Sequence, residues 1–287
     1  MSQFAGKTVV ISGGAEGIGL SIAKALGEQQ MNIVLADIDL KNLEKARSEL
    51  DKAGFKVLAV ALDVADEAQW QEVAKQTIER FGKVHMVVNN AGVTGDISPV
   101  EGQDKKGWQW TLDVNLMGVV YGAKVMVPLI KEHGEGGWII NVASMAGMAG
   151  VPFGGSYTAT KSAVVALSES WHGELKRDGI NVSVLCPAFV QTRIHESHRN
   201  RPARYQSDDS NSTGDNGKAL VESGIEVSII GKRVVEALNV GELYIFTHPN
   251  YRHAIQQRFA AIDAAFERAA QSPLLQHIVD QEIDFLK

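Results

Sequence analysis

The feature that most constrains this chain is a repeated alternation of short apolar, β-rich runs with helical stretches. Parallel strands need a connection of a dozen or more residues, usually a helix, so strands that alternate with helices pair in parallel. Such strands are covered on both faces and read as continuous apolar runs. Seven runs fit this description, at residues 8–11, 32–36, 56–62, 84–89, 137–142, 181–185 and 242–246. The sequence therefore predicts an α/β fold: a doubly wound parallel sheet of about seven strands with helices on both faces.

The length of 287 residues suits one doubly wound domain, so we predict a single domain over residues 1–287 with its core at about 5–247. Residues 191–224 break the alternation, because they are polar and longer than an ordinary connection. We expect them to form either a lid over the substrate or a flexible surface insertion. Residues 248–287 form a C-terminal extension, in which 253–270 has the apolar spacing of an amphipathic helix that packs against this or another subunit.

Charge and cysteine content exclude several classes of protein. A net charge of −6 without a basic block argues against nucleic acid and anionic lipid as partners. The single cysteine, Cys186, rules out an intramolecular disulfide and a cysteine zinc cluster, as is typical of a reducing compartment. Residues 1–6 show no basic leader, and no apolar run approaches membrane-spanning length. We therefore expect a cytoplasmic protein that contacts no membrane.

A glycine-rich turn, residues 12–19, lies between the first predicted strand and the first helix. Its residues Gly13, Gly17, Ile18 and Gly19 would let backbone N–H groups and the helix N-terminus approach a pyrophosphate. The turn could also be merely a tight strand-to-helix connection. Its position between strand and helix favours dinucleotide binding.

Asp37 ends the second predicted strand, at about the separation of roughly 20 residues that dinucleotide folds use. Its carboxylate could accept hydrogen bonds from both adenosine-ribose hydroxyls and would repel a 2′-phosphate, which favours NAD over NADP. Glu16 and Asp39 add negative charge nearby. The alternative for Asp37 is a solvated carboxylate at a strand end.

Two further motifs follow predicted strands at the edge where α/β sheets bind ligands. Asp63-Val64 follows the third strand, and Asp63 could contact the adenine. The fourth strand ends in Asn89, followed by Asn90, Ala91 and Gly92. A helix N-cap for Asp63 and an ordinary turn for the second motif are the simpler interpretations.

Tyr157 and Lys161 are four residues apart in a predicted helix at 157–177, so their side chains share one face. A nearby ammonium favours the phenolate and lowers the pKa of a tyrosine, which is too high in water for a general base at neutral pH. Such pairs are also common on solvated helix faces, so this one needs corroboration.

Two other residues supply that corroboration. Ser144 follows the fifth strand, where its hydroxyl could bind the substrate oxygen and stabilise charge that develops there. Asn115 lies inside the predicted helix 108–131, a poor place for asparagine by propensity, which suggests a specific role such as holding a water beside Lys161.

With these motifs the sequence resembles the short-chain dehydrogenase/reductase family over roughly residues 5–247. The matching motifs are Ser12-Gly13-x-x-x-Gly17-Ile18-Gly19, Asp63-Val64, Asn89-Asn90-Ala91-Gly92, Asn115, Ser144, Tyr157-x-x-x-Lys161 and Cys186-Pro187. The resemblance implies a Rossmann-like fold, with Tyr157 as acid/base, Ser144 polarising the alcohol or carbonyl, Lys161 binding the nicotinamide ribose and Asn115 supporting a proton relay. It also implies that Pro187, Val190 and Thr192 contact the cofactor, and that the protein is a homodimer or homotetramer.

The substrate end is less defined. Apolar residues that suit a hydrophobic or aromatic alcohol flank the predicted site, at Val93, Met145, Met148, Val151, Pro152 and Phe153. The histidines at 195 and 198 have no neighbouring carboxylate or cysteine cluster, so we expect no catalytic metal. Four arginines at 193, 199, 201 and 204 could bind an anionic group or simply be solvated.

These observations predict an NAD-dependent enzyme that interconverts a secondary alcohol and a ketone of small-molecule size. Two alternatives remain. One is a 3-oxoacyl-thioester ketoreductase, against which Asp37 argues because such enzymes commonly use the phosphorylated cofactor. The other is a non-catalytic NAD-binding sensor or scaffold, which would have no need of the four catalytic candidates.

Overall fold

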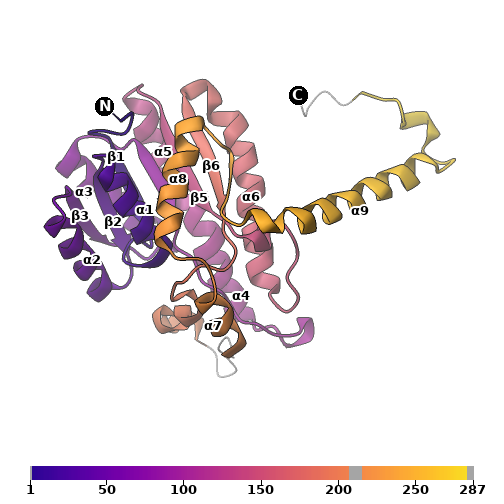
Figure 1. Cartoon of the computed structure of the whole chain (residues 1–287), viewed down its shortest axis with the longest axis horizontal. Coiled ribbons are helices and arrows are strands. Elements are labelled where there is room, and N and C mark those ends of the chain that lie inside the picture. Colours follow the sequence, from indigo (N-terminus) through magenta and orange to yellow (C-terminus); the bar gives the residue numbers. More distant parts are fainter. Residues whose placement is uncertain (1, 207–214, 283–287) are drawn as a thin grey trace. The chain divides into compact units, whose positions relative to one another are not determined.

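A computed structural model describes residues 2–206 and 215–282. Its centre is a seven-stranded sheet with the order β3-β2-β1-β4-β5-β6-β7, in which every neighbouring pair is parallel (Figure 1). The strands are β1 Thr8–Ser12, β2 Asn32–Asp37, β3 Val57–Ala61, β4 Met86–Asn89, β5 Gly137–Val142, β6 Ile180–Cys186 and β7 Tyr244–Phe246. The predicted fold class is confirmed, and each of the seven predicted runs overlaps one observed strand.

Helices cover both faces of the sheet because successive strand residues point to opposite sides. Val9 and Ile11 of β1 join one apolar cluster with α1, α2 and α8, whereas Val10 joins a second cluster with α3, α5 and α6. The helices of this part are α1 Gly17–Glu28, α2 Leu40–Lys52, α3 Glu67–Phe81, α4 Lys105–Leu112, α5 Gly118–Glu132, α6 Gly155–Leu175, α7 Asp215–Glu222 and α8 Ser228–Val240.

The strand order reverses between β1 and β4. The chain builds outward from β1 to β3, then returns to the other side of β1 and continues from β4 to β7. At such a reversal the loops after the two central strands diverge, and ligands bind beside the carboxyl ends of these strands. The glycine-rich turn after β1 and residues 90–92 after β4 both lie at this point.

The predicted continuous helix 108–131 is wrong in one respect. A π-helical turn, Asp113–Met117, separates α4 from α5 and places Asn115 in a wider coil. An 18-residue part of the joined stretch Lys105–Glu132 has a mean hydropathy of 1.3, so by length and composition it could span a membrane, contrary to our sequence-based expectation. Met126 and Ile130 of this stretch are fully buried in the second apolar cluster, as in a core helix.

The polar segment 191–224 has more regular structure than the sequence indicated. It contains the 3₁₀ turns Ile194–Asn200 and Ala203–Tyr205 and the helix α7, while residues 207–214 lie outside the described ranges. An isolated bridge between Val190 and Ile225 joins its two ends. Whether the segment acts as a lid stays a prediction.

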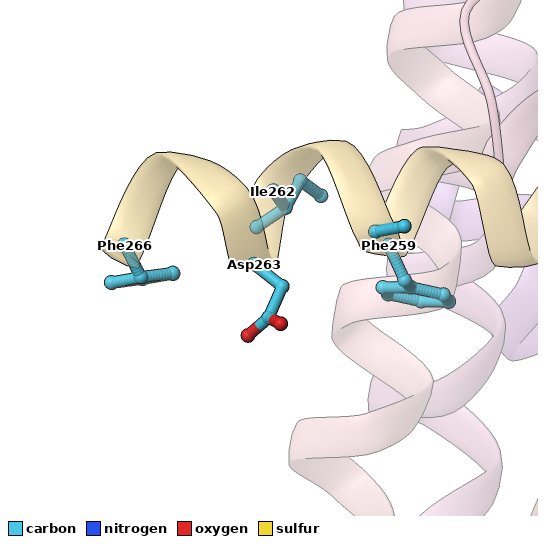
Figure 2. Close-up of a pocket in the computed structure, with 5 residues that line it drawn as sticks. Phe259, Ile262, Asp263 and Phe266 are labelled. Atoms are coloured by element: carbon cyan, nitrogen blue, oxygen red, sulfur yellow. The ribbon is translucent and has the colours of Figure 1, made fainter. Parts of the chain in front are cut away.

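Contacts divide the chain into two compact units, Met1–Thr247 and His248–Lys287. The second unit contains the helix α9, Arg252–Ala270, close to the predicted span, and its described residues include no buried side chain. Figure 2 shows Phe259, Asp263 and Phe266 on one side of α9, where Phe259 and Phe266 are exposed. The prediction of one domain over residues 1–287, with the extension packed against a subunit, stays a prediction.

Candidate active site

The turn after β1 requires glycine for reasons of conformation and space. Gly13 and Gly17 have φ values of +62° and +56°, which L side chains rarely adopt. A Cβ on Gly13 would lie 2.8 Å from Asn90 Nδ2, and a Cβ on Gly19 would lie 2.2 Å from the carbonyl oxygen of Gly13. Ile18, between these glycines in the first turn of α1, packs against the first apolar cluster. The turn can therefore present its backbone to a ligand without intervening side chains.

Residues after β4 support this turn. Asn90 Nδ2 donates to the carbonyl oxygens of Ser12 and Gly13, both at 2.9 Å. Ser12 Oγ accepts from the backbone N–H groups of Asn90 and Ala91 at 3.0 and 3.2 Å. The amide of Asn90 thus fixes the shape of the glycine-rich turn, a role that sequence reasoning did not foresee.

Asp37 lies against the same turn rather than in solvent. Its Oδ2 accepts from the backbone N–H of Ala15 at 3.0 Å, and its Oδ1 accepts from that of Asp39 at 3.0 Å. Burial raises the pKa of the Asp37 carboxyl, and the two backbone hydrogen bonds oppose this shift. The alternative interpretation of Asp37 as a solvated carboxylate is therefore wrong. Its two carboxylate oxygens are hydrogen-bond acceptors that lie beside the glycine-rich turn.

Asp63 has a partner that the sequence did not suggest. Its Oδ2 forms an ion pair with Arg204 Nη2 at 2.5 Å, and its Oδ1 accepts from the backbone N–H of Ala65 at 3.1 Å. The N-cap of α3 is Asp66, so the simpler interpretation of Asp63 as the helix cap is wrong. Val64 is buried, and its carbonyl oxygen accepts from Trp70 Nε1 at 3.1 Å.

Tyr157 and Lys161 lie on the first two turns of α6 and face one another. Lys161 Nζ is 5.7 Å from the centroid of the Tyr157 ring and donates to the carbonyl oxygen of Val142 at 2.8 Å. Burial lowers the pKa of Lys161 to about 8. Burial also raises the pKa of Tyr157, which is the opposite of the predicted direction. The Lys161 ammonium lies over the ring and bonds a carbonyl oxygen rather than the phenol oxygen.

Ser144 completes this group from the end of β5. Its side chain hydrogen-bonds the Tyr157 phenol, which lowers the pKa of Tyr157 and partly opposes the effect of burial. Ser144 Oγ also accepts from the backbone N–H of Ala146 at 3.1 Å and lies 3.4 Å from the carbonyl oxygen of Pro187, which is an alternative acceptor for its single proton. The structure therefore brings together three of the four predicted catalytic residues around the two hydroxyl groups.

Asn115, the fourth, is fully buried and holds the loop after β4. Its Oδ1 accepts from the Val93 N–H at 2.8 Å, and its Nδ2 donates to the Val93 carbonyl oxygen at 2.9 Å. A Cβ on Gly92 would lie 3.3 Å from both Asn115 Oδ1 and Lys161 Nζ. Asn115 is thus next to Lys161 across Gly92, and π-helical turns of this kind often occur at functional sites.

The loop after β6 lies beside both the glycine-rich turn and the hydroxyl of Ser144. The carbonyl oxygen of Pro187 accepts from the backbone N–H of Met145 at 2.9 Å. A Cβ on Gly17 would lie 3.3 Å from Thr192 Cγ2, so Thr192 borders the turn. Val190 is buried and belongs to the bridge with Ile225. All three predicted loop residues are placed, and their contacts with a cofactor stay predictions.

The arginines of segment 193–204 all pair with carboxylates. Arg193 and Arg199 both form ion pairs with Glu16 of the glycine-rich turn. Arg201 is buried and pairs with Asp96. With Arg204 bound to Asp63, each of the four already has an acidic partner, so the structure gives no support to an anionic-substrate site built from them.

One group of possible metal ligands is present among the described residues: His85, His133 and Glu135. His85 Nδ1 accepts from the Thr8 N–H at 3.1 Å, and its Nε2 lies 3.2 Å from Glu135 Oε2. His133 Nε2 bonds the Val84 carbonyl oxygen, and its Nδ1 accepts from the Glu135 N–H. The group lies at the amino end of the sheet, and every ring nitrogen of the two histidines already has a hydrogen-bond partner. The three residues therefore connect loops, and their arrangement does not indicate a metal site.

Comparisons with known proteins agree with this geometry. The short chain dehydrogenase family model matches residues 7–203. The CLA biosynthesis dehydrogenase/reductase of Lactiplantibacillus plantarum is 33% identical over 274 residues, covering 91% of this chain and 95% of that protein. The 3-alpha-(or 20-beta)-hydroxysteroid dehydrogenase of Mycobacterium tuberculosis is 39% identical over 188 residues, covering 65% and 70%.

Among solved structures, a short chain dehydrogenase/reductase from Burkholderia phymatum in complex with NAD superposes with a TM-score of 0.88 at 34% identity. The match covers 92% of this chain and 97% of that one. The family model spans well over half of the chain and includes every predicted catalytic residue. The chain therefore belongs to the short-chain dehydrogenase/reductase family of oxidoreductases.

Proposed function

We propose that this protein is an NAD-dependent oxidoreductase that interconverts a secondary alcohol and a ketone. The observation that carries the proposal is the meeting of the Ser144 and Tyr157 hydroxyls, with Lys161 over the tyrosine ring, at the edge of the sheet that also bears the glycine-rich turn. A proton-transfer group and a site for a dinucleotide therefore adjoin one another, as hydride transfer from an alcohol requires.

The residues fit a dinucleotide. The turn at Gly13 and Gly19 leaves no room for side chains, so a pyrophosphate could approach its backbone N–H groups. When bound, NAD supplies the acceptor for the hydride. Support for NAD over NADP comes from Asp37, a buried carboxylate beside the turn, because it would repel a 2′-phosphate.

In this proposal Tyr157 takes the hydroxyl proton of the alcohol during oxidation and returns it during reduction. Ser144 donates a hydrogen bond to the same substrate oxygen and stabilises the charge that develops on it. The pKa of Tyr157 must fall for this chemistry at neutral pH, which needs the Lys161 ammonium to move from the Val142 carbonyl toward the phenol oxygen. Asn115, which adjoins Lys161 across Gly92, would steady that position.

The alternatives are less well supported. A thioester ketoreductase would commonly use NADP, against which the carboxylate of Asp37 argues. A non-catalytic NAD sensor would not need a serine hydroxyl bonded to a buried tyrosine phenol. We further propose that the substrate is a hydrophobic small molecule, and that the protein binds neither nucleic acid nor a catalytic metal. We also propose that it works in the cytoplasm as a homodimer or homotetramer.

The test is the formation of NADH by the purified protein from NAD and a panel of aliphatic, aromatic, steroid and sugar secondary alcohols, repeated with NADP. We expect the absorbance of NADH to increase with time when apolar alcohols are the substrates. We also expect kcat/KM to be lower with NADP than with NAD. Turnover that favours NADP would overturn the cofactor assignment. Tight NAD binding without turnover of any panel alcohol or ketone would favour the sensor.

A further inference from the structure

The backbone at Phe153 is strained. Among the described residues, two that are not glycine have a positive φ, Gln30 at +66° and Phe153 at +65°. Gln30 ends the first helix in an exposed turn, a common place for this conformation. Phe153 is a bulky aromatic residue, for which a left-handed conformation is a true outlier, and such strain tends to occur at functional sites.

Hydrogen bonds on both sides impose this conformation. The carbonyl oxygen of Phe153 accepts from the Ser98 N–H at 3.1 Å, and the Gly154 N–H donates to the Val151 carbonyl oxygen at 3.2 Å. The Val151 N–H in turn donates to Thr158 Oγ1 of α6 at 3.2 Å. The turn is therefore fixed between the loop after β4 and the helix that carries Tyr157.

Packing of the ring does not offset the strain, because 60% of Phe153 is exposed. Three more large apolar residues of these two loops are also exposed: Ile97, Val100 and Val151. We call these four residues the apolar edge. Four large apolar side chains that are exposed together, one of them on a strained backbone, indicate a surface that a partner from outside the described chain covers.

The position of the apolar edge indicates that partner. Phe153 lies on the loop that runs from Ser144 to Tyr157, four residues before the tyrosine. Ile97 and Val100 lie on the loop that begins at Gly92, which adjoins Lys161. Both loops therefore start or end at residues of the proposed reaction centre, and the Ser98–Phe153 hydrogen bond joins them.

We propose that Phe153 is a specificity-determining residue whose ring contacts an aromatic or alicyclic ring attached to the carbinol carbon of the substrate. The phenyl group is exposed on this strained turn, where a substrate ring can cover it and remove both apolar surfaces from water. This inference rests on the proposed function and adds the substrate class: ring-bearing secondary alcohols and their ketones.

The test separates strain from substrate contact. Phe153→Gly and Phe153→Asn both remove the ring and tolerate a positive φ, so each should raise Tm or leave it unchanged. We expect each to lower the ratio of kcat/KM for 1-phenylethanol to that for 2-propanol by about tenfold, mainly through KM, which is the order expected when an apolar pocket loses its contact. Gln30→Gly is the matched control, because it relieves the same backbone conformation and should leave that ratio unchanged.

The outcomes are distinguishable. If the wild type oxidises both alcohols and both Phe153 variants keep the wild-type ratio, the role of Phe153 is wrong while the proposed function stands. A ratio that falls equally in Gln30→Gly would also overturn that role, because relief of strain alone would explain it. If the wild type oxidises neither these alcohols nor any other of the panel, the proposed function fails, and the substrate class fails with it.

Discussion

Replacing Arg201 by methionine should destabilise the protein more than any comparable change in the same segment. The guanidinium is almost completely buried: Nη1 lies 3.1 Å from Asp96 Oδ1, and Nη2 lies 3.6 Å from Asp104 Oδ2. Nε donates to the carbonyl oxygen of Tyr205 at 3.0 Å, and the group lies 5.0 Å from the centroid of the Trp110 ring. Methionine keeps much of the volume and removes every one of these polar contacts.

The size of the loss in unfolding free energy follows from the carboxylate that Arg201→Met leaves without its partner. Asp96, with a side chain only 10% exposed, would keep a carboxylate without its main cation, and breaking a buried pair in this way costs about 3–5 kcal/mol. Arg193 offers the matched control, because its side chain is 50% exposed and pairs with Glu16 and Glu196. Arg193→Met should therefore cost less than about 1 kcal/mol.

Urea unfolding followed by tryptophan fluorescence gives both free energies of unfolding. We expect the double variant Asp96→Asn/Arg201→Met to regain part of the loss, because it removes the more buried carboxylate that Arg201→Met leaves without its cation. Similar small losses for Arg201→Met and Arg193→Met would refute the reasoning, since they would mean that water or another cation reaches Asp96. A double variant no better than the single one would also count against it.

Three further predictions follow from the site. Lys161 has a pKa of about 8 in the folded protein and 10.5 in the unfolded chain, so the unfolded chain binds more protons between these pH values. Without cofactor, the free energy of unfolding of the wild type should therefore rise over this pH range by roughly 3 kcal/mol relative to that of Lys161→Met. Parallel curves of unfolding free energy against pH for the two proteins would contradict this. Gly19→Ala should weaken NAD binding more than about tenfold in calorimetry, because its Cβ would meet the Gly13 carbonyl; Gly173→Ala, with open space around it, should bind normally and gain about 0.5–1 kcal/mol of stability. Asp37→Asn should raise the NADP-to-NAD ratio of kcat/KM, and an unchanged ratio would remove Asp37 from cofactor selection.

The strands could be predicted from the sequence because their residues are buried on both faces. Residues 137–142, for example, form a continuous run whose six members are all buried, and the predicted and observed bounds coincide. The order of the strands was not predicted, since local patterns do not say which strands are neighbours. The π-helical turn had a weak signal, an asparagine inside an apolar helix, which indicated a role for Asn115 without revealing the wider coil.

The parts of the site that one short motif forms could be predicted from the sequence. The parts in which residues far apart in the sequence come together could not. Spacing alone placed Tyr157 and Lys161 on one face of α6. The pair Arg201 and Asp96 joins positions 105 residues apart, and no local pattern indicates that an arginine in a polar loop is buried. The direction of the Tyr157 pKa was also not predictable, because it depends on how deeply the phenol is buried and on which atom Lys161 bonds.

The central claim is that Tyr157 transfers the proton in hydride exchange with a secondary alcohol. Its most direct test compares wild type with Tyr157→Phe, in NADH formation from a ring-bearing alcohol at saturating NAD and in calorimetric titration with NAD. The account predicts that the variant binds NAD with similar affinity and loses turnover by a factor of roughly 10² or more, the scale of general acid–base catalysis. Turnover by Tyr157→Phe within a few-fold of wild type would contradict it.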